Sequence, residues 1–184
     1  MCMFFDNYFK KISNSLSLIK PIELEGLTGI VVNAVSKNKK IILVGNGGSA
    51  AIASHLTVDF INAAKIKALN FTDSGIITCF ANDYGYENWV AKALECYADA
   101  GDVVVFISSS GQSANIINGA KTAKEMGLST ITLSGFLKNN PLRVMGDLNL
   151  WVDSKEYNIV EMTHHIWLLS VVDYIIEKNK VKKV

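Results

Sequence analysis

Two short apolar runs in this chain each lead directly into a turn rich in glycine or serine. Residues 41–44 read Ile-Ile-Leu-Val and precede GNGGSA, and residues 103–107 read Val-Val-Val-Phe-Ile and precede SSSGQSAN. A continuous β-branched run closed by turn residues is typical of a strand that is buried on both faces, as in a parallel sheet. We therefore expect a fold built around a parallel sheet, with polar turns along one edge.

The rest of the chain alternates between apolar runs of strand type and segments with helical spacing. A third strand is predicted at 130–133, and weaker patterns predict strands at 66–71 and 148–152. Amphipathic spacing predicts an N-terminal helix at 5–19, which Pro21 ends. Further helices are expected at 23–36, from Ser49 onward, and at 76–81, 86–98, 113–126 and 159–178. This alternation predicts right-handed crossovers and a three-layer α/β/α sandwich.

The size and charge of the chain limit what it can be. Its 184 residues, 49% of them apolar, suffice for one buried core but not for two, so a single domain is expected over 1–184. Within it, 1–37 is predicted to form a helical extension that packs on the domain or in an oligomer interface. The 18 basic and 17 acidic residues nearly cancel, which argues against partners such as nucleic acid or a membrane surface.

The cysteines and the apolar runs indicate the compartment. Cys2, Cys79 and Cys96 are odd in number and widely spaced, which argues against a disulfide framework and against a zinc knuckle. No signal-peptide pattern opens the chain, and no later run approaches the roughly 18 apolar residues that a membrane span requires. We expect a soluble, cytoplasmic protein.

The two turns carry groups that suit an anion. In a parallel sheet they lie at the carboxyl ends of the strands, where exposed amides and the positive ends of the following helices converge. Glycines allow the backbone to approach a phosphate closely, and serine hydroxyls donate hydrogen bonds to its oxygens. The predicted phosphate-binding residues are Asn46, Gly47, Gly48, Ser49, Ser108, Ser109, Ser110, Gln112 and Ser113.

Two other interpretations of the turns remain open. The serines could serve only as helix N-caps, because serine is a preferred residue at that position. Gly45, Gly47 and Ala50 also loosely fit the dinucleotide-binding pattern, with Asp73 as the acidic residue beyond the second strand. The dinucleotide interpretation leaves the turn at 108–113 without a role, so a phosphate site is the leading hypothesis.

Three segments of the chain together resemble a known family. VGNGGSA, ANDYGYENW and ISSSGQSANI, in this order, are similar to the phosphoheptose isomerases, SIS (sugar isomerase) domain enzymes that convert sedoheptulose 7-phosphate to a heptose phosphate. The resemblance extends to about Gly135. It implies a five-stranded, flavodoxin-like parallel sheet, a homotetramer, and a site at subunit interfaces. It also implies that Asn46 and the serines of both turns contact phosphate, and that Asp83 contacts substrate.

Aldose–ketose isomerisation through an enediol requires a base and an acid, and one helix offers candidates for both. His55 and Asp59 are four residues apart, so they share a helix face. They resemble the His-x-x-x-Glu pair of the family, which serves as base and, in some members, as part of a zinc site. Asp59 is one methylene shorter than that glutamate. We expect Asp59 to be the base, although a hydrogen-bonded surface pair is the alternative.

The last helix departs from the pattern that the resemblance implies. Glu161 matches the family, but Val160 replaces a glutamine and Thr163 replaces a first histidine. The position of a later histidine, the partner acid/base, is occupied by Leu168. His164 or His165 could take over that role, with Glu161 one turn earlier orienting the ring. Alternatively, these histidines bridge subunits or serve only as hydrogen-bond partners of Glu161.

The sequence thus supports a leading function and two alternatives. The leading hypothesis is isomerisation of sedoheptulose 7-phosphate for surface-polysaccharide biosynthesis. The alternatives are a non-catalytic, regulatory sugar-phosphate-binding protein and an isomerase for another sugar phosphate. Because Val160 and Leu168 remove half of the zinc ligands that the resemblance implies, no required metal and no cofactor are predicted.

Overall fold

The computed structural model describes residues 2–181, with side chains placed for residues 3–179. Its centre is a five-stranded sheet in the order β2-β1-β3-β4-β5, in which every pairing is parallel. The strands are β1 (Ile41–Gly45), β2 (Ala68–Asn70), β3 (Val103–Ser108), β4 (Ser129–Ser134) and β5 (Leu148–Trp151). This strand order confirms the predicted flavodoxin-like sheet.

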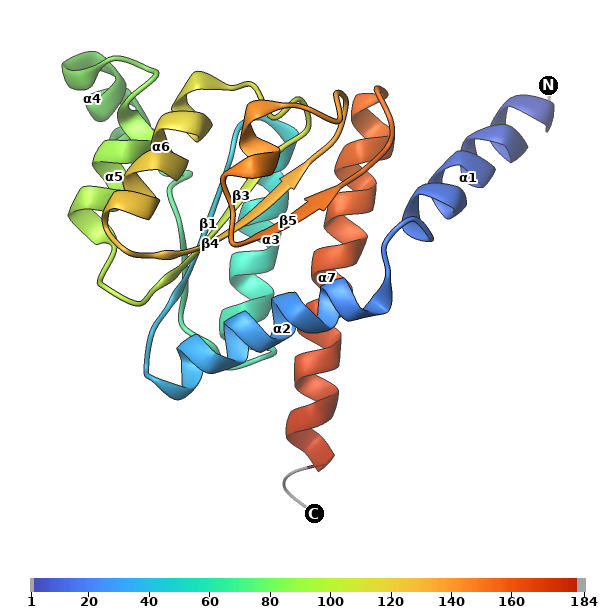
Figure 1. Cartoon of the computed structure of the whole chain (residues 1–184), viewed down its shortest axis with the longest axis horizontal. Coiled ribbons are helices and arrows are strands. Elements are labelled where there is room, and N and C mark those ends of the chain that lie inside the picture. Colours follow the sequence, from blue (N-terminus) through green and yellow to red (C-terminus); the bar gives the residue numbers. More distant parts are fainter. Residues whose placement is uncertain (1, 182–184) are drawn as a thin grey trace.

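Helices cover both faces of the sheet and complete the predicted three layers (Figure 1). One face is covered by α2 (Pro21–Ser36), α3 (Gly48–Asn62) and α7 (Tyr157–Val181). The other face is covered by α4 (Ser74–Tyr84), α5 (Trp89–Tyr97), α6 (Ala114–Glu125) and the short 3-10 helix η1 (Pro141–Val144). Each expected helix is present, whereas η1 was not predicted.

Strand β3 shows why the sheet has two separate cores. All six of its residues are buried. Val105 and Ile107 contact the apolar cluster under α3 and α7, whereas Val104 and Phe106 contact the cluster under α5 and α6. Because successive side chains of a strand point to opposite faces, a central strand with both faces covered must be apolar throughout. The continuous run in the sequence follows from this position.

The N-terminal segment is divided between the core and the surface. Helix α2 buries Leu27 and Val31 in the core, so it is an integral part of the domain. Helix α1 (Cys2–Leu16) extends away from the body beyond its contact with α7 (Figure 1). The indole N–H of Trp167 donates to the carbonyl of Leu16 at 3.1 Å, which ties the end of α1 to α7.

Helix α7 has a composition that was not expected. Between Tyr157 and Asn179 it is long and apolar enough to cross a membrane, with a mean hydropathy of 1.3 in its most apolar window. The expectation that no segment has this character is therefore wrong for α7. Half of that window is buried inside the protein, where Leu168, Val171 and Val172 contact the core under α2 and α3. A helix that is apolar on several sides is typical of such a central position.

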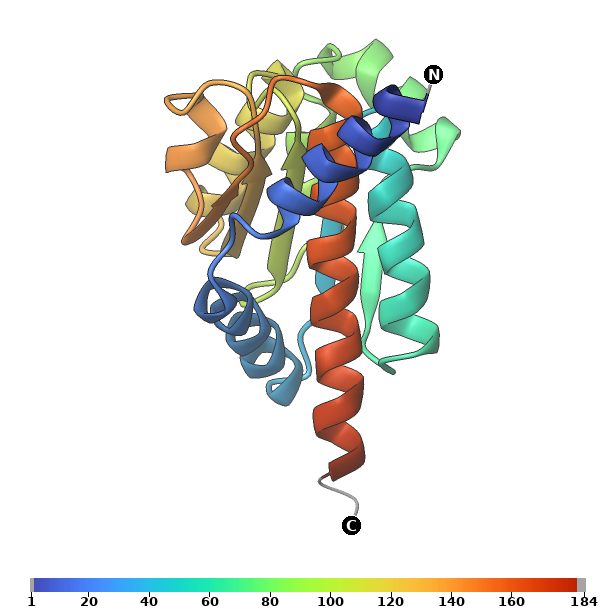
Figure 2. The same ribbon diagram turned by 90° about the vertical axis from the view of Figure 1, so that its right-hand side faces the viewer.

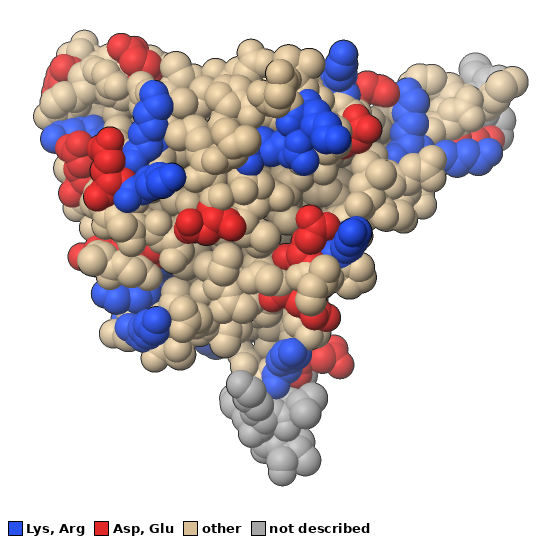
Figure 3. Space-filling view, viewed as in Figure 1, with Lys and Arg blue, Asp and Glu red and all other residues tan. Residues whose placement is uncertain are grey.

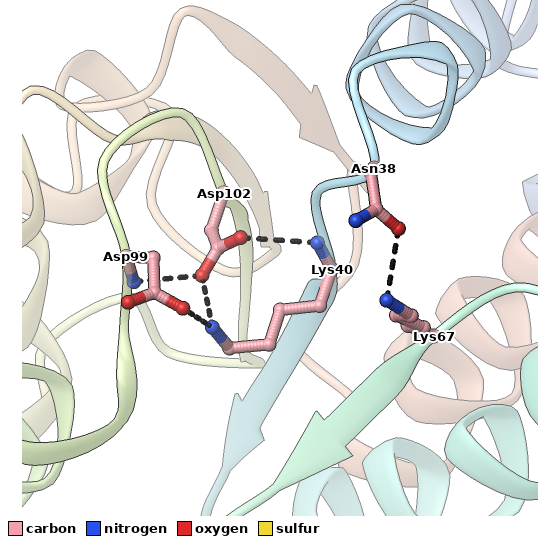
Figure 4. Close-up of polar contacts among 5 residues, drawn as sticks. All are labelled: Asn38, Lys40, Lys67, Asp99 and Asp102. Atoms are coloured by element: carbon pink, nitrogen blue, oxygen red, sulfur yellow. Dashed lines mark hydrogen bonds and ion pairs between the residues drawn. The ribbon is translucent and has the colours of Figure 1, made fainter.

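The amino-terminal edge of the sheet is held by a group of charged residues (Figure 4). Lys40 Nζ lies 2.6 Å from carboxylate oxygens of both Asp99 and Asp102. The buried Asp102 carboxylate also accepts from the backbone N–H of Lys40 at 3.0 Å and from that of Asp99 at 2.8 Å. These bonds connect the start of β1 to the loop before β3, at the edge opposite the glycine and serine turns.

The surface offers no large field of one sign on the face shown in Figure 3, where basic and acidic side chains are interspersed. Cys79 and Cys96 are free and exposed, as expected for thiols outside a disulfide framework. The side chain of Cys2, and the chain ends at residue 1 and residues 182–184, lie outside the described part of the structure.

Candidate functional site

The two turns predicted from the sequence lie side by side in the structure. They follow the paired strands β1 and β3, in which Gly45 is opposite Ile107. Together with the first turns of α7 they enclose a cavity of about 280 Å³, called the serine pocket below. The pocket is lined by Asn46, Gly47, Gly48, Ser49, Ile107, Ser108, Ser109, Ser110, Ser113, Tyr157 and Glu161.

One buried hydroxyl in the serine pocket, that of Ser109, lacks a hydrogen-bond partner in the part of the chain that the structure describes. Ser109 is 5% exposed, and its Oγ makes no hydrogen bond among the described residues. Leaving a buried hydroxyl without a hydrogen bond costs about 1–3 kcal/mol of stability. Such a group is therefore uncommon unless a ligand supplies the missing hydrogen-bond partner. Ser49 and Ser108 beside it are buried as well. The pocket therefore has the donors of an anion site and at least one donor that is free.

The serines do not act as helix caps. Ser113 occupies the N-cap position of α6, and Gly47 that of α3, but neither helix start has a side-chain cap hydrogen bond. The Ser110 hydroxyl accepts from the backbone N–H of Gln112 at 3.2 Å, which closes the turn on itself. Gln112 is exposed and does not line the pocket, contrary to the prediction for its side chain.

A buried asparagine that the sequence reasoning missed supports the serine turn. Gly111 has a φ of +63°, and a Cβ at this position would overlap with the side chain of Asn140. Asn140 is fully buried and donates to the carbonyl of Leu137 at 2.8 Å and to the Ser134 hydroxyl at 3.1 Å. Only glycine fits at position 111, because its φ is positive and the side chain of Asn140 is close. The Asn-Pro pair at 140–141, a common turn signal, could have indicated this residue.

The two turns are joined by a pair of amides. Asn46 Nδ2 donates to Asn115 Oδ1 at 2.9 Å, and Asn115 Nδ2 donates to Asn46 Oδ1 at 2.8 Å. The Tyr86 hydroxyl also donates to Asn46 Oδ1, at 3.4 Å. Asn46 lines the pocket as predicted, but most of its amide is used to hold the turns together. Asn115, which is 2% exposed, is a second residue that the sequence reasoning did not single out.

A chain of three polar side chains connects α3 to α7. His55 Nε2 lies 3.3 Å from Asp59 Oδ2, so these two residues share a helix face as their spacing predicts. His165 Nε2 lies 2.9 Å from His55 Nδ1, with the two rings nearly perpendicular. If His55 donates to Asp59, its Nδ1 accepts from His165, which gives a continuous line of hydrogen bonds. Burial, with a smaller contribution from the charge of His55, lowers the pKa of His165 although Asp59 opposes the shift.

The adjacent His164 is excluded from this chain. It is completely buried, and its Nε2 donates to the carbonyl of Ser134 at 3.1 Å. Burial lowers the pKa of His164 to about 4, and its Nδ1 has no hydrogen-bond partner in the described part of the chain. The ring of His164 therefore points into the core and does not line the serine pocket, which disfavours the predicted acid/base role.

Glu161 also differs from its predicted role. No hydrogen bond or ion pair within the described residues joins it to His164 or His165, so it does not orient either ring. Its carboxylate instead lines the serine pocket and lies against Gly48, where a Cβ would overlap with it. Burial raises the pKa of Glu161.

His164 predicts a measurable dependence of stability on pH. The folded protein holds this imidazole neutral down to about pH 4, whereas the unfolded chain protonates it near pH 6.5. Its contribution is complete above about pH 6.5 and is lost as the pH falls toward 4, by about 3 kcal/mol in total. In urea unfolding at one protein concentration, wild type should lose about that much more stability than His164→Gln between these pH values. Equal losses in both proteins would contradict the assignment.

The remaining predicted positions lie away from the pocket. Asp83 is exposed on α4, where it accepts from Asn82 Nδ2 at 2.9 Å and does not line the serine pocket. Asp73 caps α4, because its Oδ1 accepts from the backbone N–H of Ile76 at 3.0 Å. With that carboxylate used as a cap, the dinucleotide interpretation loses its acidic residue.

The side chains present do not make a zinc site of the kind that the resemblance implies. Val160 and Leu168 stand at two of the ligand positions and are buried in the apolar core, where they offer no donor atom. Across the described residues no group of three or more His, Cys, Asp or Glu is arranged to hold a metal ion. His55 and Asp59 alone fall short of the four ligands that zinc prefers.

Comparisons with known proteins agree on one family. Residues 7–135 match the family model described as the SIS domain. The chain is 34% identical to the phosphoheptose isomerase of Thermodesulfovibrio yellowstonii, over 92% of this chain and 86% of that protein. It is 39% identical to a probable phosphoheptose isomerase of Thermoplasma acidophilum, over 78% of this chain and 83% of that protein.

A solved structure extends the likeness to three dimensions. The phosphoheptose isomerase of Neisseria gonorrhoeae superimposes on this fold with a TM-score of 0.85 at 26% identity. The superposition covers 95% of each chain. The shared region therefore includes α7, where the sequence resemblance was weakest.

Proposed function

Because this chain belongs to the SIS domain family, we propose that it is a phosphosugar isomerase, and that it interconverts sedoheptulose 7-phosphate and a heptose 7-phosphate. The observation that carries this function is the serine pocket, with its buried Ser109 hydroxyl that is unpaired among the described residues. The pocket lies at the start of the α3–α7 seam, the line of contact between these helices that carries His55, Asp59 and His165. The pocket binds the phosphate, and the seam holds the sugar.

The layout of α3 and α7 supports this division. The two helices run side by side (Figure 2). Gly48 at the start of α3 lies beside Glu161, and His55 lies beside His165. At a rise of about 1.5 Å per residue, His165 lies about 6 Å beyond Glu161 and His55 about 10 Å beyond Gly48. The reacting end of an extended sugar phosphate lies at a similar distance from its phosphorus. A substrate held by its phosphate therefore places that end beside the histidine pair.

The side chains on the seam supply the proton transfers. Asp59 takes the carbon-bound proton from C1 of the ketose and returns it to C2, which converts the ketose to the aldose through an enediol. His165, whose pKa is lowered by burial, moves the proton between O1 and O2 together with His55. Each transfer contributes about 10²–10⁴-fold to the rate. Of the two histidines weighed for this role, His165 is favoured because it alone contacts the pair on α3.

We propose that this chemistry requires no bound zinc. The carboxylate and imidazole groups provide both the base and the acid, and the apolar Val160 and Leu168 remove the donors that would complete a metal site. Asp83 is assigned to the substrate by resemblance alone, since it lies on α4 outside the serine pocket.

Assembly and location follow from the same proposal. Met3, Phe4, Phe5 and Phe9 on α1 are between 58% and 75% exposed, an apolar surface that favours association with other copies. A cytoplasmic homotetramer is the state we propose, in which Asp83 of one subunit can approach the site of another. The product would serve surface-polysaccharide biosynthesis.

Direct turnover tests the function. Sedoheptulose 7-phosphate is incubated with protein that has been dialysed against EDTA, and the aldose product is followed by proton NMR. Formation of the heptose 7-phosphate is expected. Binding of the substrate without turnover would favour a non-catalytic, regulatory protein. Turnover of only a different sugar phosphate would favour an isomerase for that sugar.

A further inference from the structure

The part of the serine pocket that the structure describes contains no basic side chain. Among the described residues that line it, none is Lys or Arg, and the only carboxylate is that of Glu161. Its donors are serine hydroxyls and backbone amides at the starts of α3 and α6. A bound dianion is therefore placed beside a negative group with no positive side chain between them.

No neighbouring group neutralises Glu161. Within the described residues it takes part in no hydrogen bond and no ion pair. The titratable groups nearest to it in sequence on α7 are Tyr157, His164 and His165, and those on α3 are His55 and Asp59. Glu156, just before the start of α7, pairs with Lys11 of α1 at 2.8 Å. The half-buried carboxylate is thus available to a hydrogen-bond donor that enters the pocket.

We propose that Glu161 determines the specificity of the serine pocket: it accepts an anion that shares a proton with the carboxylate, such as a phosphate monoester, and rejects a fully ionised sulfate. This inference rests on the proposed function, because it concerns the pocket assigned to the phosphate. The second pKa of a phosphate monoester is about 6, so its monoanion can donate a P–O–H to Glu161. A sulfate has no such proton, and an unpaired like charge is an effective means of rejecting a wrong ligand.

Calorimetric titration with two matched ligands tests this specificity. The probes are heptitol 7-phosphate, the reduced substrate that cannot isomerise, and heptitol 7-sulfate. Wild type should bind the phosphate at least tenfold more tightly than the sulfate at about pH 6.5. In Glu161→Gln, which can donate a hydrogen bond without charge, the affinity for sulfate should rise at least tenfold and the ratio should approach one. Glu156→Gln, the exposed neighbour outside the pocket, is the matched control and should keep the wild-type ratio.

A second measurement does not depend on any variant. Because one proton is shared in the complex, the affinity of wild type for heptitol 7-phosphate should fall between about pH 6.5 and pH 8, by up to tenfold per unit. An unchanged ratio in Glu161→Gln, or a pH-independent affinity in wild type, would overturn the role of Glu161 while leaving the phosphate pocket intact. Failure of wild type to bind either ligand would overturn the proposed function itself.

Discussion

Asp59→Asn is expected to lower kcat/KM for sedoheptulose 7-phosphate by about 10²–10⁴-fold, because the amide cannot take a proton from carbon. The loss should lie in kcat, since Asp59 is on the α3–α7 seam and not in the pocket that holds the phosphate. Steady-state kinetics, with circular dichroism to verify folding, measures the change. Asparagine is close in size and Asp59 is only half-buried, so the fold should tolerate it.

The matched control for this variant is Asp59→Glu. It retains the carboxylate and restores the longer side chain of the phosphoheptose isomerases that the chain resembles. Activity of the same order as wild type is expected, because Asp59 is only half-buried and the site can accommodate one more methylene. Unchanged turnover in Asp59→Asn would remove Asp59 from the mechanism. Equal losses in both variants would show that its role is structural.

Ser109→Ala is expected to change binding and stability in opposite directions. The hydroxyl is buried without a partner in the free protein, so removing it relieves a cost of desolvation and should stabilise the fold by up to about 1 kcal/mol. In the complex the same hydroxyl donates to a charged phosphate, a bond worth about 1.5–3 kcal/mol. The affinity for heptitol 7-phosphate should therefore fall by about 10–100-fold, as measured by calorimetry alongside urea unfolding.

Ser134→Ala provides the comparison at the end of the neighbouring strand. Ser134 is also buried, but its hydroxyl accepts from Asn140 at 3.1 Å and does not line the serine pocket. Its removal should reduce stability by about 1 kcal/mol and have little effect on affinity. If Ser109→Ala behaved like Ser134→Ala, the Ser109 hydroxyl would be a structural group and not a ligand-binding one.

The features that could be predicted from the sequence are those set by local pattern. The apolar runs of β1 and β3 indicated a parallel sheet because both faces of these strands are covered, and the glycines and serines after them indicated the position of the pocket. The four-residue spacing of His55 and Asp59 was sufficient to place them on one helix face.

The sequence pattern could not decide which of His164 and His165 faces α3. Neighbouring residues on a helix point about 100° apart, and α7 is apolar on several sides, so its pattern does not identify the face toward α3. Only the packing shows that His164 lies in the core and His165 on the seam. Asn140 and Asn115 were missed for a related reason, because each acts on a turn that is distant in sequence.

The position of the phosphate in a co-crystal with heptitol 7-phosphate is the most direct test of the whole assignment. The phosphate is expected within hydrogen-bonding distance of Ser109 Oγ, about 2.5–3.0 Å, and in contact with the turns after β1 and β3. The carbon chain should run along α3 toward His55 and Asp59. Density for the phosphate at any other place on the protein, with the serine pocket occupied only by water, would contradict the account.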